Sequence, residues 1–183
     1  MKRIVLILLL LVGHSAMAQT PPYRSGVSSV ADIVVEEAMR YLGTPYRWGG
    51  KTPKGFDCAG FTRYIYGKFE VQLPPSAGPQ YRVGQKLKVS EIRKGDLVFY
   101  GGRGSTSSIG HVGLVTSVDK NGFYFIHSAT STGITITHST EAYYKKRYIG
   151  ACRVSHLVVS NLPAVNDDTL STPVYRRNPF LKP

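Results

Sequence analysis

Apolar residues recur at helical spacing in two stretches of the first half of the chain. Ser29 precedes a pattern that ends at Leu42, and Gly43 follows as a helix stop. The apolar positions expected to share one face of this helix are Ile33, Val34, Ala38, Tyr41 and Leu42. Asp57 precedes a second pattern, from Cys58 to Phe69, in which apolar residues recur every four positions. The pattern predicts two helices.

After residue 84 the pattern changes to the short apolar runs of β-strands. Strands are expected over Asp96–Tyr100, His111–Val118, Gly122–Ser128, Gly133–His138 and Tyr148–Ser155. The stretch from Leu73 to Gly84 is interrupted by Pro and Gly and allows at most one or two turns of helix, and one short helix is expected over Thr140–Lys146. Helices followed by antiparallel strands with short turns indicate an α+β fold. A sheet of about five or six strands is expected to carry the helices on one face.

The two ends of the chain lack this periodicity. Residues 1–18 combine a basic start, an apolar run from Ile4 to Val12 and the sequence Ala16-Met17-Ala18, which is typical of a secretory signal peptide cleaved before Gln19. The run is shorter than the roughly 20 residues that a membrane-spanning helix needs. We therefore expect an exported protein, in the periplasm or outside the cell at the wall, with no membrane span once it is mature.

The remaining chain divides into three parts. Residues 19–28 form a short polar leader, residues 29–156 a single domain, and residues 157–183 a proline-containing tail that is mobile or lies along the surface. The chain has 42% hydrophobic and 19% charged residues, which excludes a disordered protein. Its formal net charge of +12 becomes +10 once Lys2 and Arg3 leave with the signal peptide. This charge fits an anionic partner such as the cell wall, or it serves solubility alone. Nucleic acid is not expected as a partner, because no nucleic-acid-binding motif accompanies the charge.

Cys58 is the first candidate for chemistry. It lies in the first turn of the second predicted helix, where unpaired N–H groups and the helix dipole stabilise an anion, so we expect a lowered thiol pKa. Four nearby glycines leave room for another backbone to approach the sulfur: Gly49, Gly50, Gly55 and Gly60. The alternative is a small buried core residue. Cys152, in the last predicted strand, is expected to be a buried free thiol.

A nucleophilic cysteine needs a base, and His111 and His127 are the best candidates. They lie at matching ends of two successive strands. A three-residue connection over residues 119–121 would pair Val118 with Gly122 and place both histidines on one face. A two-residue Asn121-Gly122 turn, which the dipeptide favours, would place them on opposite faces. Both geometries remain open from the sequence, and no third ligand at zinc-type spacing accompanies the two histidines.

Four segments, taken together, resemble the NlpC family of papain-like bacterial cell-wall cysteine peptidases. They are PYRWGGKTPKGFDCAGF (45–61), GDLVFY (95–100), GHVGLV (110–115) and FIHSATSTGI (125–134). The resemblance extends from about Ser29 to Arg153. It implies a papain-like α+β fold in which the cysteine helix packs on an antiparallel sheet that carries the histidines. It also implies a peptidoglycan hydrolase that cleaves stem peptides, typically between γ-D-glutamate and the diamino acid, without metal or cofactor.

The resemblance assigns a role to each candidate residue. Cys58 matches the nucleophile, His111 the general base and His127 the residue that orients the base. Tyr46 matches a tyrosine beside the nucleophile, where it assists the oxyanion or contacts substrate. Asp57 either only caps the helix or also binds the substrate amine.

Three positions qualify the interpretation. Ala59 replaces the serine that commonly follows the nucleophile in this family, and the segment ending at Pro75 lacks the family's arginine. Both changes concern specificity more than reaction type. Trp48, the single tryptophan, is expected to be a packing residue. Two alternatives stay open: an amidase that cuts between muramic acid and L-alanine by the same chemistry, and a non-catalytic wall-binding module.

Overall fold

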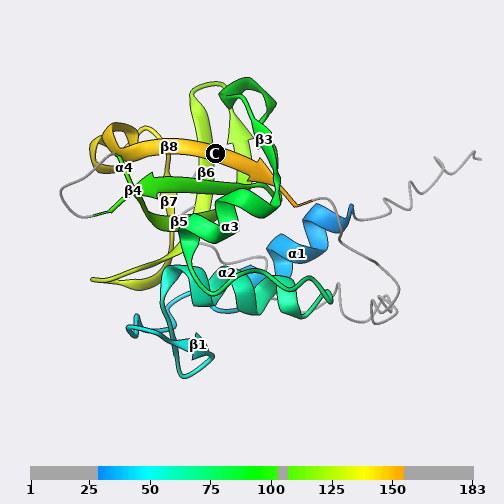
Figure 1. The fold of residues 1–183 in the computed structure, drawn as a ribbon, viewed down its shortest axis with the longest axis vertical. Helices are drawn as coiled ribbons and strands as arrows, with labels where there is room; N and C mark the ends of the chain where they lie inside the picture. The colour runs from blue at the N-terminus through cyan, green and yellow to red at the C-terminus, as the bar shows by residue number, and fades with distance from the viewer. Residues whose placement is uncertain (1–28, 103–106, 155–183) are drawn as a thin grey trace, which may run out of the picture.

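The chain folds as an α+β structure, seen in the computed structural model, which describes residues 29–102 and 107–154 (Figure 1). The helices are α1 (Val30–Met39), α2 (Cys58–Gly67), α3 (Ala77–Val83), the 3-10 helix η1 (Val89–Glu91) and α4 (Ala142–Arg147). The strands are β1 (Lys51–Thr52), β2 (Gly55–Phe56), β3 (Gln85–Leu87), β4 (Leu97–Gly101), β5 (Ile109–Asp119), β6 (Gly122–Ala129), β7 (Gly133–His138) and β8 (Tyr148–Arg153). The predicted signal peptide, leader and tail lie outside the described residues. Within those residues, no helix is long and apolar enough to cross a membrane.

A six-stranded antiparallel sheet in the order β3-β8-β4-β5-β6-β7 forms the centre of the domain. The number of strands and their antiparallel pairing confirm the predicted α+β fold. The edge strand β3 was not predicted, because it has three residues and two of them are exposed. A separate two-stranded hairpin, β1–β2, immediately precedes α2 and projects from the end of the molecule on which α2 lies (Figure 1).

Both faces of the sheet are covered, and β4 shows this most directly. Leu97 and Phe99 point into the core under α1, α2 and α3, while Val98 and Tyr100 point into a second core that includes Ile92 and Tyr144 of α4. Successive side chains on a strand point to opposite faces, so a strand with cores on both sides is buried throughout. The expectation of helices on one face only is therefore wrong, because α4 covers the other face.

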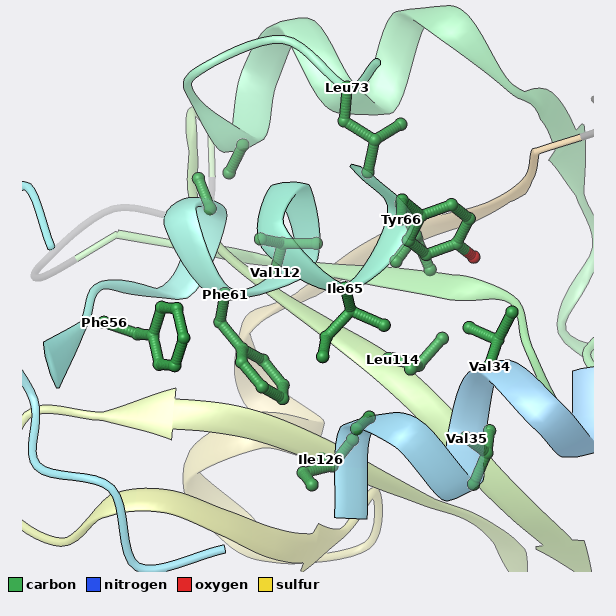
Figure 2. Packing of buried hydrophobic residues seen from close by; sticks show 14 of the residues in the cluster. Val34, Val35, Phe56, Phe61, Ile65, Tyr66, Leu73, Val112, Leu114 and Ile126 are labelled. Atoms are coloured by element: carbon green, nitrogen blue, oxygen red, sulfur yellow. The ribbon is translucent and has the colours of Figure 1, made fainter. Parts of the chain in front are cut away.

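The larger core lies between α1, α2 and the sheet (Figure 2). Phe61, Ile65 and Tyr66 of α2 are fully buried against strand residues such as Val112 and Leu114. A run of buried aromatic and branched side chains on one helix face stabilises its position, at roughly 1.5–3 kcal/mol for each large side chain. This packing fixes the helix that carries Cys58.

Helix α1 begins as predicted and ends earlier than predicted. The Ser29 hydroxyl accepts a hydrogen bond from the Asp32 backbone N–H, and the Ser29 backbone N–H donates to the Asp32 carboxylate. The two bonds form a capping box. The helix ends at Met39, and Leu42 is 41% exposed instead of facing the core. The Gly43 N–H donates to the Ile134 carbonyl at 2.9 Å, which holds the chain against β7 and away from the helix axis.

The β5–β6 hairpin follows neither predicted turn. Asp119 pairs with Gly122, so the turn residues are Lys120 and Asn121, and the register near the turn would place the two histidines on opposite faces. A β-bulge between Val115 and Ser117 shifts the register by one residue. The bulge restores the pairing that the three-residue connection would have given.

Candidate active site

The N-terminus of α2 is built around Asp57 and Gly60. The Asp57 carboxylate accepts a hydrogen bond from the Gly60 N–H at 2.6 Å, and the Asp57 N–H donates to the Gly50 carbonyl at 2.9 Å. A Cβ on Gly60 would clash with the carbonyl oxygen of Gly50. Glycine is therefore required here for the hairpin to pack against the helix, and Cys58 is held at the first helical position.

The sulfur of Cys58 lies against the beginning of β5. The Cys58 thiol donates a hydrogen bond to the Gly110 carbonyl oxygen, with the sulfur 4.0 Å from that oxygen. Burial and the neighbouring Asp57 carboxylate raise the pKa of Cys58, and backbone N–H groups, among them that of Val112, oppose this only partly. The expected lowering of the thiol pKa is therefore wrong for the ligand-free geometry, because desolvation outweighs the helix N-terminus.

Beyond the bulge, the two histidines face each other. Extending the β5–β6 register places His127 opposite Gly113, and a Cβ on Gly113 would lie 3.3 Å from His127 Cβ. Nε2 of His111 is 2.9 Å from Nδ1 of His127. This bond leaves Nδ1 of His111 as the ring nitrogen available to the thiol or the substrate.

Thr137 continues the hydrogen-bonded chain that starts at His111 and passes through His127. Nε2 of His127 is 3.0 Å from Oγ1 of Thr137, a buried residue on β7. Burial lowers the pKa of His111 to about 4, and burial together with the charge of His111 lowers the pKa of His127 well below its ordinary value. Both imidazoles are therefore neutral at pH 7 in the ligand-free protein.

Tyr144 of α4 was missed by the sequence analysis. Its ring centroid lies 5.2 Å from that of His127 and 6.2 Å from that of His111. Burial raises the pKa of Tyr144 to about 12. A helix from the other side of the sheet thus shields both imidazoles from water. No sequence signal linked Tyr144 or Thr137 to Cys58, since their proximity depends on the strand order.

Tyr46 and Asp57 lie near the thiol. Burial and the nearby Cys58 and Asp57 raise the pKa of the Tyr46 phenol. Tyr46 also forms a parallel β-bridge with Phe56, which holds it beside the start of α2. The structure thus brings the candidates near the N-terminus of α2 close to the two histidines of the β5–β6 hairpin.

The sequence analysis also predicted the burial of two residues outside this site, Cys152 and Trp48. Cys152 is a free, fully buried thiol, which confirms that expectation, and Cys58 is likewise free. Trp48 is 89% exposed, so the expectation of a packing role is wrong. Its turn points the indole to solvent. Among the described residues, no three His, Cys, Asp or Glu side chains gather closely enough to hold a metal ion.

Comparison with known proteins places these residues in a family. The model of the NlpC/P60 family matches residues 43–153, well over half of the chain. This protein belongs to the NlpC/P60 family. The match includes all five predicted site residues and stops before the predicted tail.

The family relatives differ in length and in named activity. The chain is 35% identical over 146 residues to the gamma-DL-glutamyl hydrolase of Bacillus subtilis strain 168, covering 78% of this chain and 34% of that protein. It is 37% identical over 126 residues to an Escherichia coli K12 protein named murein DD-endopeptidase MepS/murein LD-carboxypeptidase, covering 68% of this chain and 63% of that one. The chain thus spans only part of the length of both relatives.

The structure of one NlpC/P60 domain is matched almost along its whole length. The NlpC/P60 domain of the peptidoglycan hydrolase SagA superposes with a TM-score of 0.56 at 33% identity, covering 67% of this chain and 97% of that domain. The described residues therefore contain a nearly complete NlpC/P60 domain.

Proposed function

We propose that this NlpC/P60 protein is an exported cysteine peptidase that hydrolyses stem peptides of peptidoglycan, between γ-D-glutamate and the diamino acid. The observation that carries the proposal is the placement of Cys58, at a helix N-terminus, against the residue that precedes His111. The hydrogen-bonded His111–His127 pair supplies the base that such a thiol needs. The Bacillus subtilis relative is named for γ-glutamyl hydrolysis, which supports the choice of bond.

The reaction begins from a neutral thiol and a neutral imidazole. The Cys58 S–H proton passes to Nδ1 of His111 as the sulfur bonds to the amide carbonyl carbon. The C–N bond then breaks, and the leaving amine takes the proton from His111. The product is a thioester. His111 next removes a proton from water, which attacks the thioester and releases a carboxylic acid and the thiol.

Two further groups assist this reaction. The Cys58 backbone N–H at the start of α2 stabilises the oxyanion of the tetrahedral intermediate, and the Tyr46 hydroxyl supplies a second donor. His127 holds the His111 ring by its bond to Nε2 and accepts the Nε2–H when His111 is protonated. No metal or cofactor takes part in this sequence of steps.

The direct test is digestion of purified peptidoglycan, followed by mass spectrometry of the fragments. We expect glycan fragments whose muramic acid still carries L-Ala-γ-D-Glu with a new D-glutamyl carboxyl end, together with released peptides that begin with the diamino acid. Cys58→Ala should give neither product. Cys152→Ala is the matched control, because it removes the other thiol, and it should retain activity. Fragments cut between muramic acid and L-alanine would establish the amidase instead. Binding without cleavage by the wild type would establish a non-catalytic module.

We further propose that residues 1–18 direct export to the periplasm or to the outside of the cell, where peptidoglycan is accessible. Mass spectrometry of the protein recovered from its native compartment should give an amino terminus at Gln19. A cytoplasmic protein that retains Met1 would contradict this proposal.

A further inference from the structure

The turn that directly precedes the β1–β2 hairpin presents an exposed tryptophan on a fixed backbone. Trp48 and Gly49 are the central residues of a turn closed by a 2.9 Å bond from the Gly50 N–H to the Arg47 carbonyl. Gly49 has φ +65°, which a residue with a side chain rarely adopts. The hairpin base is held on α2 through the Asp57–Gly50 hydrogen bond. Because an 89% exposed indole is an unusual surface feature and its backbone is fixed, the side chain is already placed for contact with a partner.

Four exposed cations lie on this turn, on the hairpin that follows it and on α2, which contacts β1. They are Arg47, Lys51, Lys54 and Arg63, and within the described residues none has an acidic or hydrogen-bonding side-chain partner. No Asp or Glu occurs between Glu37 and Asp57. Two of these cations, Lys51 and Arg63, line an open groove of about 330 Å³ together with Tyr64. The groove lies on the part of α2 that faces away from the core, since Phe61 and Ile65 point the other way.

We infer that this hairpin surface, formed by Trp48 with Arg47, Lys51, Lys54 and Arg63, binds the peptidoglycan polymer beside the stem peptide that is being cut. The inference rests on the proposed function. A γ-linked glutamate keeps its α-carboxylate free, so neighbouring stem peptides on one strand present a series of anions to the four cations. The flat indole face fits the C–H face of a sugar ring in the glycan strand, and aromatic residues often dominate such contacts.

The test compares binding and cleavage on polymer and on soluble peptide. Co-sedimentation with purified sacculi would use Cys58→Ala as the parent, so that the polymer stays intact. We expect Trp48→Ala to weaken binding at least about fivefold, and Trp48→Phe to weaken it less. Lys51→Gln/Lys54→Gln should weaken binding and reduce its dependence on salt. In the active protein, the same changes should lower the ratio of sacculus cleavage to soluble tripeptide cleavage.

A matched control removes the same charge elsewhere. Lys88 and Lys120 are exposed, and Lys120 lies in the turn at the opposite end of β5 from His111. If Lys88→Gln/Lys120→Gln weakens binding as much as the hairpin pair does, the attraction is general charge and the inference is wrong. Binding by the hairpin variants within twofold of the parent would also overturn it. A wild type that cuts neither polymer nor peptide would instead refute the proposed function.

A second inference concerns Thr137, and it rests on different contacts. The bonds from His111 Nε2 to His127 Nδ1, and from His127 Nε2 to Thr137 Oγ1, use both nitrogens of a fully buried ring. If His111 Nδ1 is to accept the thiol proton, Nε2 of His111 must carry the hydrogen and donate it to His127. His127 must then carry its own hydrogen on Nε2 and donate it to an acceptor.

The geometry assigns Thr137 as the positioning residue that supplies this acceptor and thereby fixes the reactive tautomer of His111. The other groups packed around the two rings are Tyr144 of α4 and Phe125 of β6, whose rings lie 5.2 and 4.9 Å from His127. Phe125 cannot accept the hydrogen bond, and among the described residues Tyr144 forms no hydrogen bond with either imidazole.

Thr137→Val keeps the shape of the side chain and removes the acceptor, whereas Thr137→Ser keeps the hydroxyl. We expect Thr137→Val to lower kcat at least about tenfold with little change in KM, and Thr137→Ser to restore most of it. The acid limb of the pH–rate profile should move to a different pH in Thr137→Val, and nitrogen NMR should show a mixture of His111 tautomers. Equal kcat, equal acid limb and an unchanged tautomer in a folded Thr137→Val protein would overturn the assignment.

Discussion

Cys58 and His111 lie in surroundings that disfavour charge on either side chain. Burial raises the pKa of the thiol and lowers the pKa of the imidazole to about 4. Both directions stabilise the neutral pair over the thiolate–imidazolium ion pair. In the proposed mechanism, proton transfer to His111 therefore accompanies attack of the sulfur on the carbonyl carbon.

This neutral pair predicts how thiol alkylation depends on pH. The rate of Cys58 alkylation by iodoacetamide in the ligand-free protein should rise only as the pH passes the ordinary thiol range, because the thiolate is the nucleophile. Following the loss of free thiol from pH 5 to 10 measures it, with Cys152→Ala ensuring that a single thiol reacts. A rate that is already at its plateau at pH 6 would show an ion pair and contradict the neutral assignment.

Ala59 concerns substrate choice. In the proposed function, a serine at this position would offer the amino end of the substrate a hydroxyl in addition to Asp57 and Tyr46, whereas alanine offers none. We expect free L-Ala-γ-D-Glu-diamino acid peptides to be cleaved faster than the same peptides with N-acetylated alanine. Ala59→Ser should widen that difference. Measurement of kcat/KM on the two peptides decides it, and equal values in both proteins would show that the amine is not bound here.

At the scale of elements, two local features place the candidate reacting groups. The Asp57 cap begins α2 at Cys58, and the bulge between Val115 and Ser117 returns His127 to the face of His111. Each is a departure from a regular element by one or two residues. Each decides which way a functional side chain points.

The cap and any amine-binding role of Asp57 can be separated. Asparagine caps a helix about as well as aspartate, whereas alanine costs about 1 kcal/mol of stability. Asp57→Asn should therefore keep the melting temperature of the wild type, while Asp57→Ala lowers it. If the carboxylate also binds the substrate amine, Asp57→Asn loses the preference for free over N-acetylated peptides. An Asp57→Asn protein that keeps the full preference would restrict Asp57 to capping.

At the scale of the whole molecule, the candidate active site is made from both layers around the sheet. Helix α2 lies on one face and brings Cys58, while the histidine rings pack against Tyr144 on the other face. Cys58 and the histidine rings come together at the beginning of β5, where Gly110 precedes His111. The domain therefore excludes water from the imidazoles on one side and leaves the thiol partly exposed on the other.

The buried histidines also make global stability depend on pH. A lowered pKa in the folded state means that the unfolded chain binds more protons, so stability is present above about pH 6.5 and is lost as the pH falls towards the folded value. His111 alone, with a folded pKa of about 4, should cost about 2 kcal/mol of stability between pH 7 and 5. Urea unfolding at the two pH values measures the difference. His111→Gln/His127→Gln should flatten it, and an unchanged slope in that variant would contradict the assignment.

The sequence by itself determined most of the secondary structure of this domain and its α+β class, and it supplied the candidates for the reacting residues. Those properties depend on local signals: the Ser29 and Asp57 caps, apolar periodicity, and a cysteine at a helix start. The sequence analysis did not predict short elements with weak local signals, such as β3 and the β1–β2 hairpin.

Only the tertiary structure decided the protonation state of the site and the residues that complete it. The pKa of Cys58 depends on burial, which a helix position alone does not give. The shared face of His111 and His127 depends on a bulge that no pattern of hydrophobic residues encodes. Thr137 and Tyr144 reach the histidines through strand pairing and packing between residues distant in sequence. Non-local contacts of this kind arise from the packed chain as a whole, so no segment carries them alone.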